Sequence, residues 1–120
     1  MAKHWALILL IVYIIFLTGL SLLNLGKLPS LGSSFDDKIF HFASHAVLTG
    51  LFFNYLTKTK TSKPILLSAL APVIYGLIIE WLQGIGNTSR TSDIYDILAN
   101  ILGMIFVVII LSIKRNVKLK

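Results

Sequence analysis

Residues 94–113 read IYDILANILGMIFVVIILSI, a run of twenty residues in which Asp96 is the one charged side chain. A bilayer core about 30 Å thick is crossed by about 20 helical residues. Hydrocarbon offers no hydrogen-bond partner to exposed backbone groups, so a lipid-facing segment of this kind has to be a helix rather than an open strand. The run therefore predicts a transmembrane helix.

Three similar runs precede it. Residues 5–23 carry no charge, residues 39–56 are interrupted only by two histidines, and residues 65–82 contain a single acid near their end. The first run exceeds the apolar region of a signal peptide, about 7–15 residues, and no A-x-A-like cleavage site follows it, so we expect it to be retained. We expect an all-α, four-helix transmembrane bundle with helices near residues 5–23, 38–57, 64–83 and 93–113.

The composition agrees with this prediction. Of the 120 residues, 56% are hydrophobic and 13% are charged, and the mean hydropathy is +0.84. A soluble domain of this length could not bury so much apolar surface, because short chains bury the smaller fraction of theirs. Despite the net charge of +6, this hydropathy excludes a disordered basic tail and a nucleic-acid-binding domain. The length allows one domain, residues 1–120, and the absence of cysteine excludes a disulfide framework.

The basic residues predict the orientation. The two ends of the chain and the segment between the second and third helices hold eight Lys or Arg and no acid. The other side holds three basic residues and all five acids. Cytoplasmic segments carry an excess of Lys and Arg, so we expect both termini in the cytoplasm. Residues 24–38 and 83–93 then face outward.

Small residues predict where two helices approach each other. Ala46 and Gly50 on the second predicted helix, and Ala99 and Gly103 on the fourth, form small-xxx-small pairs. Such pairs let the backbones of membrane helices come close. We therefore expect the second and fourth helices to pack tightly.

Polar side chains gather at the outward end of three helices. Successive members of each group are three or four residues apart and share a helix face: Asp37, His41 and His45; Glu80 and Gln83; Asp93, Asp96 and Asn100. Ionisable groups inside a membrane are costly unless they meet partners or water. We therefore expect these stripes to face the bundle interior, with Lys38 and Arg90 as the cations beside them.

At these positions the chain resembles the VanZ-like family of membrane proteins. Residues 37–42 match D-K-x-x-H-F, and residues 80–83 match E-x-x-Q. Residues 90–103 match R-x-x-D-x-x-D-x-x-x-N-x-x-G. The resemblance covers the whole chain and implies a protein of the cell envelope. It also implies a link to low-level resistance to the glycopeptide teicoplanin, with which the family's namesake is associated.

Several of these residues also have purely structural interpretations. Ser34 and Asp37 fit an S-x-x-D capping pattern, and Asp93 and Asp96 fit the first turn of a helix. Glu80 is at the negative end of its helix dipole, where a carboxylate does not cap, so a buried ion pair and a functional site both remain open for it.

The two histidines raise the question of a metal. His41 and His45 are four residues apart and could ligate a metal together with the acids. Two histidines outside an H-E-x-x-H motif are only weak evidence for a metal site. The sequence therefore predicts no metal and no cofactor, and it leaves metal binding by the histidine and carboxylate cluster open.

The first functional hypothesis is a binding protein of the cell membrane. Its partner would be a membrane lipid or a lipid-linked wall precursor, with no role for nucleic acid and with homo-oligomerisation left open. The planar guanidinium of Arg90 would donate two parallel hydrogen bonds to a phosphate or carboxylate, and the ammonium of Lys38 would act as a point charge. The predicted binding residues are Asp37, Lys38, His41, Glu80, Gln83, Arg90, Asp93, Asp96 and Asn100.

Two alternatives are weighed against it. An integral-membrane enzyme would use Glu80 or His41 as the general base for phosphoryl or acyl transfer on a lipid head group. A proton-linked carrier would need a relay across the whole membrane. The predicted cytoplasmic half of the helices holds no ionisable residue that could continue one, which disfavours the carrier.

Overall fold

The computed structural model describes residues 2–22, 36–85 and 94–119, which form four helices and, among these residues, no strand. The side chains of residues 36, 37, 84 and 116–119 are outside this description. All four helices are long and apolar enough to cross a membrane, which confirms the all-α fold predicted from the sequence. The helices are α1 (Ala2–Leu22), α2 (Asp36–Lys58), α3 (Pro64–Ile85) and α4 (Ile94–Leu119).

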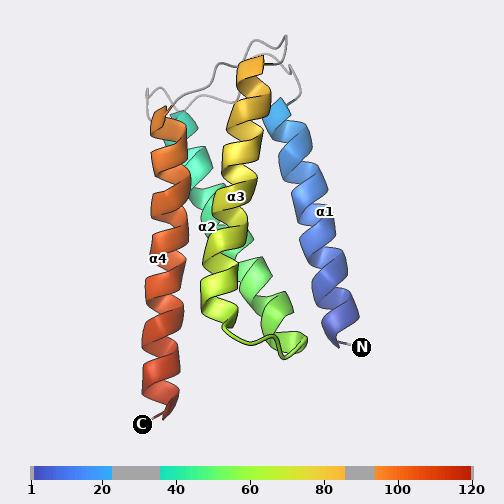
Figure 1. Cartoon of the computed structure of the whole chain (residues 1–120), viewed down its shortest axis with the longest axis vertical. Coiled ribbons are helices and arrows are strands. Elements are labelled where there is room, and N and C mark those ends of the chain that lie inside the picture. The colour runs from blue at the N-terminus through green and yellow to red at the C-terminus, as the bar shows by residue number, and fades with distance from the viewer. Residues whose placement is uncertain (1, 23–35, 86–93, 120) are drawn as a thin grey trace.

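The helices alternate in direction along the bundle. Figure 1 shows the N and C ends of the chain at the same end as the connection between α2 and α3. We call this end the basic end. The opposite end, where α1 and α3 finish and α2 and α4 begin, is called the polar end, because it holds His41, Glu80, Gln83, Asp96 and Asn100.

The helix bounds differ from the predictions mainly at α4. This helix continues to Leu119, six residues past the predicted end at residue 113. The added residues include Lys and Arg, which are good helix formers and interact favourably with the negative C-terminal end of a helix. Pro64 opens α3 as predicted, because the first turn of a helix does not use its backbone N–H groups.

The distribution of polarity is that of a membrane protein. Among the described residues, ten buried side chains are polar or charged, and seven, including that of Pro72, are apolar. Large apolar side chains cover the outside along every helix, with Trp5, Ile15 and Ile94 each more than 60% exposed. Such a surface suits lipid rather than water. The chain is thus built as a multi-pass membrane protein with polar groups in its centre.

Helix α2 is the centre of the bundle. It contacts α1, α3 and α4, whereas α1 and α4 share no contact among the described residues. It is also the least apolar of the four spans. Its polar side chains therefore meet protein partners instead of lipid.

The tightest packing is between α2 and α4. A Cβ added to Gly103 would collide with the carbonyl oxygen of Phe42 and would lie 3.2 Å from the backbone nitrogen of Ala46. The predicted close approach of these helices is therefore confirmed at Gly103. At Gly50 the prediction is wrong, because no heavy atom lies within 4 Å of an added Cβ.

The connection at the basic end is a helix-ending turn. The backbone N–H of Thr61 donates to the carbonyl of Leu56, and that of Lys60 donates to Thr57. This pair of bonds is the Schellman motif, which usually has glycine at the position of positive φ. Here Lys60 occupies it with a φ of 57°, a conformation that is costly for a residue with a Cβ.

Candidate functional site

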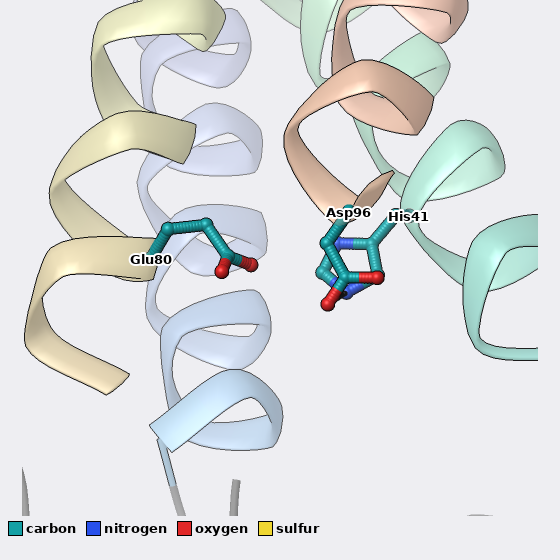
Figure 2. Close-up of side chains that lie close together, drawn as sticks. All are labelled: His41, Glu80 and Asp96. Carbon is teal, nitrogen blue, oxygen red and sulfur yellow. Dashed lines mark ion pairs between the residues drawn. The ribbon is translucent and has the colours of Figure 1, made fainter. Parts of the chain in front are cut away.

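Three ligand-type side chains from three helices meet at the polar end. His41 comes from α2, Glu80 from α3 and Asp96 from α4, and one side-chain donor atom of each lies within 4.8 Å of the other two. All three residues are buried, with Glu80 only 2% exposed. Figure 2 shows the carboxylate of Glu80 directed toward Asp96 and His41. We call these three residues the carboxylate–histidine cluster.

The alternating helix directions explain why the cluster forms. α2 and α4 start at the polar end and α3 finishes there. His41 is in the second turn of α2, Asp96 is in the first turn of α4, and Glu80 is in the last turns of α3. Residues far apart in the sequence are thereby placed at one depth of the bundle.

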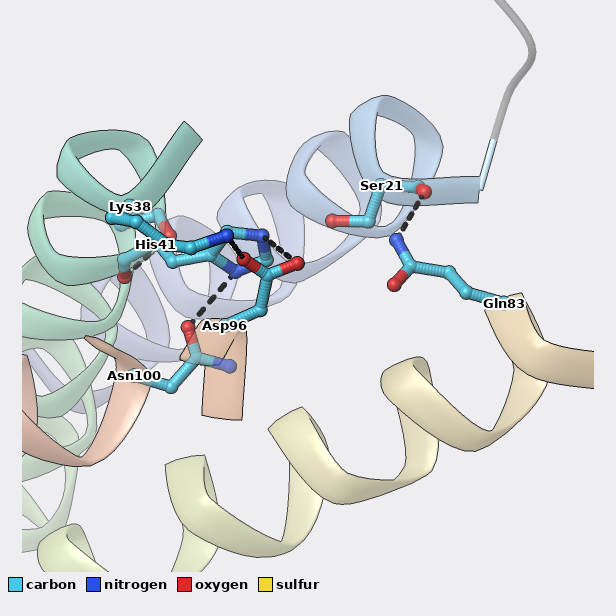
Figure 3. A network of polar contacts seen from close by, with 7 residues as sticks. Ser21, Lys38, His41, Gln83, Asp96 and Asn100 are labelled. Atoms are coloured by element: carbon cyan, nitrogen blue, oxygen red, sulfur yellow. Dashed lines mark hydrogen bonds and ion pairs between the residues drawn. The ribbon is translucent and has the colours of Figure 1, made fainter. Parts of the chain in front are cut away.

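Asp96 is the centre of a polar network (Figure 3). Its Oδ1 atom accepts a hydrogen bond from Lys38 Nζ at 2.6 Å, and its Oδ2 atom lies 3.4 Å from His41 Nε2. The Lys38 side chain is 28% exposed and that of Asp96 is 7% exposed. Lys38 therefore lies at the partly exposed edge of a network whose other members are buried.

Asn100 fixes the orientation of the His41 ring. Its Oδ1 atom lies 3.0 Å from His41 Nδ1. An amide oxygen can only accept a hydrogen bond, so Nδ1 carries the hydrogen and donates it. The other ring nitrogen, Nε2, is thereby directed at Asp96.

His45 takes a different direction from His41. Its ring packs against Tyr75, with the ring centres 6.0 Å apart. A Cβ added to Gly76 would lie 2.9 Å from His45 Nε2 and 2.9 Å from Asn100 Nδ2. His45 is thus packed against α3 and is not a member of the carboxylate–histidine cluster, although the sequence placed both histidines on one stripe.

Helix α1 also contributes to the polar end. Gln83 Nε2 donates a hydrogen bond of 2.7 Å to the backbone carbonyl of Ser21, as Figure 3 shows. Further along the bundle, Tyr13 donates to the carbonyl of Ser44, and the hydroxyls of Thr18 and Tyr75 are 2.8 Å apart. These bonds join α1 to α2 and α3.

The structure brings together five of the nine predicted binding residues in one network or cluster: Lys38, His41, Glu80, Asp96 and Asn100. Gln83 is at the same end but bonds to α1. Asp37 is in the first turn of α2, where its side chain is outside the description. Arg90 and Asp93 are outside the described residues.

Sequence reasoning missed two contributors. Ser21 has a signal in the sequence, because Tyr13, Thr18 and Ser21 are polar interruptions of an otherwise apolar helix. Gly76 has a weaker signal: it is a glycine inside a helix, which is unfavourable unless packing requires it. Here packing does require it, since the side chains of His45 and Asn100 fill the space that a Cβ would take.

The arrangement limits the chemistry that is available. The carboxylates and the imidazole are enclosed by helices, and the partly exposed group is the ammonium of Lys38. Such a site can present a positioned cation at its rim and can hold a proton or a small cation in its interior. Searches of protein-family models, curated proteins and solved structures find no match to the chain.

Proposed function

We propose that the polar end binds the anionic head group of a membrane lipid or of a lipid-linked envelope precursor. The observation that carries the proposal is the position of Lys38, the partly exposed cation of an otherwise buried network. Asp96 holds its Nζ atom at 2.6 Å. An ammonium group has three N–H donors, so this ion pair does not preclude a hydrogen bond to a phosphate or carboxylate oxygen.

The buried groups behind Lys38 serve to position it. Asp96 contacts both Lys38 and His41, and Asn100 holds the His41 ring. A cation whose partners are locked in this way loses little freedom when a head group binds, which favours affinity. Arg90, which the sequence places before the start of α4, would supply a second cation with fork geometry for phosphate.

Binding is better supported than catalysis on a lipid. The general base of the enzyme alternative would be His41 or Glu80. A base has to reach the proton that it removes within hydrogen-bond distance or through one water. Both residues are enclosed, and the two ring nitrogens of His41 face Asn100 and Asp96.

The finer proposal is that the chain is a VanZ-like protein of the cell membrane with both termini in the cytoplasm. What supports it is that residues of all three matched stretches, namely His41, Glu80 and Asn100, lie at one end of the bundle. The basic residues of the opposite end support the orientation. Expression in a teicoplanin-susceptible bacterium should then raise the inhibitory concentration of teicoplanin, and the Arg90→Ala variant should not.

Native mass spectrometry of the detergent-purified chain tests the binding proposal. Phosphatidylglycerol and phosphatidylcholine serve as anionic and zwitterionic probes. The wild type should prefer phosphatidylglycerol, and Lys38→Met should lower that affinity about tenfold. A hydrogen bond between charged groups is worth about 1.5–3 kcal/mol, and 1.4 kcal/mol is a tenfold change.

Lys58→Met is the matched control. Lys58 is on the same helix but is exposed at the basic end, and its removal should change the affinity less than about twofold. Equal losses in the two variants would mean general attraction of anionic lipid to basic residues. That result, or an unchanged Lys38→Met variant with a wild-type helical spectrum, contradicts the proposal.

A further inference from the structure

We propose that His41, Glu80 and Asp96 form a site for one divalent transition-metal ion of the zinc class inside the polar end of the bundle. This inference does not depend on lipid binding. It rests on the donor set, on the spacing of the donors and on the groups that hold them.

The donor set suits a zinc-class ion. One imidazole nitrogen and two carboxylate oxygens are common ligands of Zn²⁺, and the two carboxylates would offset its charge, with Lys38 adding one positive charge at the edge of the site. Ca²⁺ takes six to eight oxygen ligands, and Mg²⁺ retains several waters. A buried cluster that offers one imidazole and two acids suits neither of these ions.

The spacing is close to that of a bound ion. At a ligand distance of about 2.1 Å, two donors of a tetrahedral zinc site are about 3.4 Å apart. His41 Nε2 and Asp96 Oδ2 already have a separation of 3.4 Å. All three donors are within 4.8 Å of one another, so small side-chain movements of Glu80 would complete three protein ligands and leave a fourth position open.

The surrounding groups match those that orient metal ligands. A ligating histidine nearly always donates its other ring N–H to a fixed acceptor, and ligating carboxylates accept hydrogen bonds in turn. Asn100 Oδ1 accepts from His41 Nδ1, which directs Nε2 into the cluster. Lys38 engages Oδ1 of Asp96 and leaves Oδ2 facing His41.

The alternative is that the Nε2 atom of His41 carries a proton instead of binding a metal ion. A protonated His41 together with Lys38 would balance the two carboxylates without a metal. A zinc ion would displace that proton on binding, whereas a site built to hold only a proton would bind no Zn²⁺, so a titration with metal distinguishes the two.

Isothermal titration with ZnCl₂ of the whole chain, purified with a tag that lacks histidine and stripped with a chelator, tests the site. The wild type should bind one Zn²⁺ per chain and give no comparable signal with MgCl₂. His41→Ala should lower the Zn²⁺ affinity at least 100-fold, and Asn100→Ala should lower it about 10- to 100-fold by releasing the ring. The control is His4→Ala, because His4 is exposed near the N-terminus of α1. The Zn²⁺ affinity of this variant should equal that of the wild type.

Cobalt gives a readout that needs no variant. Co²⁺ loaded into the wild-type chain should show the intense visible absorption of tetrahedral coordination, and Zn²⁺ should remove that absorption. The proposal is overturned if the folded wild type binds Zn²⁺ with a dissociation constant above about 100 μM, because such binding is far weaker than that of structural zinc sites. Equal Zn²⁺ affinity of wild type and His41→Ala also overturns it, as does a Co²⁺ spectrum identical to that of the aqueous ion.

Discussion

The two ends of the bundle use charge in opposite ways. At the basic end Lys58, Lys63, Lys114 and Arg115 are exposed. At the polar end Glu80 and Asp96 are buried with His41, and Asp96 is paired with Lys38. Exposed cations need no protein partner and contribute to orientation in the membrane. Buried charges need partners, so those of the polar end specify which helices meet there.

A cavity at the basic end strengthens this contrast. It has a volume of about 530 Å³ and is lined mainly by apolar groups from α2, α3 and α4, including Phe53, Ile65 and Leu111. Lys114 and Arg115 also line it, and both residues are exposed. No ionisable group is enclosed there among the described residues. Burial of charge is thus confined to the polar end of the described structure.

The largest expected effect concerns orientation. The chain has no cysteine, so single cysteines can be introduced at Ser62, in the α2–α3 connection, and at Ser30, in the segment between α1 and α2. A membrane-impermeant maleimide should label Ser30→Cys in intact cells and should label Ser62→Cys only after permeabilisation. The reverse pattern would place the basic end outside and contradict the proposed orientation.

The next largest effect is the difference in stability between removing a buried charge and removing an exposed one. Asp96→Ala should lower the free energy of unfolding by roughly 3 kcal/mol, because removal of one partner of a buried pair leaves the others uncompensated. Lys114→Ala should change it by no more than about 0.5 kcal/mol, as is usual for exposed positions. Unfolding in mixed micelles of increasing SDS content measures both values. Equal effects would show that burial does not distinguish the two ends.

The contact of α2 with α4 gives a third prediction. Gly103→Ala should cost about 1–3 kcal/mol, because the added methyl meets the backbone at Phe42 and forces the helices apart. Gly50→Ala adds the same methyl into open space and should be neutral or stabilising by up to about 1 kcal/mol. The same unfolding titration applies. A Gly103→Ala variant as stable as Gly50→Ala would mean that the helices do not pack at this distance.

The smallest effect is at the turn of the basic end. Lys60→Gly should raise the free energy of unfolding by about 1 kcal/mol, since glycine adopts positive φ without the Cβ penalty. The exposed Lys58→Gly variant is the control, and it should be destabilising because Lys58 is still a helical residue, the last of α2. A loss of stability in Lys60→Gly would contradict the observed turn.

The helices and the polar end could be predicted from the sequence because their signals lie within single segments of the chain. The length of an apolar run and the position of a charge within it are properties of one segment, and they sufficed to place His41, Glu80 and Asp96 at one depth. The pairing of α2 with α4 through Gly103 was also predicted, because small residues at four-residue spacing have a direct effect on packing.

The partners within the site could not be predicted in the same way. His41 and His45 are equivalent by spacing, but the packing of α2 directs the first toward Asn100 and the second toward Gly76. Likewise, Gln83 bonds to a backbone carbonyl of α1, and any residue could supply a carbonyl. Such contacts depend on how each helix is rotated against its neighbours, which no single segment specifies.

Photolabelling tests most directly whether the polar end is the binding end. The wild-type chain is placed in phosphatidylcholine vesicles that contain a few per cent of phosphatidylglycerol with a photoactivatable head group, and the labelled residues are mapped by mass spectrometry. Label should concentrate on the first turns of α2 and α4, around Lys38 and Asp96, and Lys38→Met should remove it. Label confined to the basic end, around Lys114 and Arg115, and unchanged in Lys38→Met would contradict the proposed function.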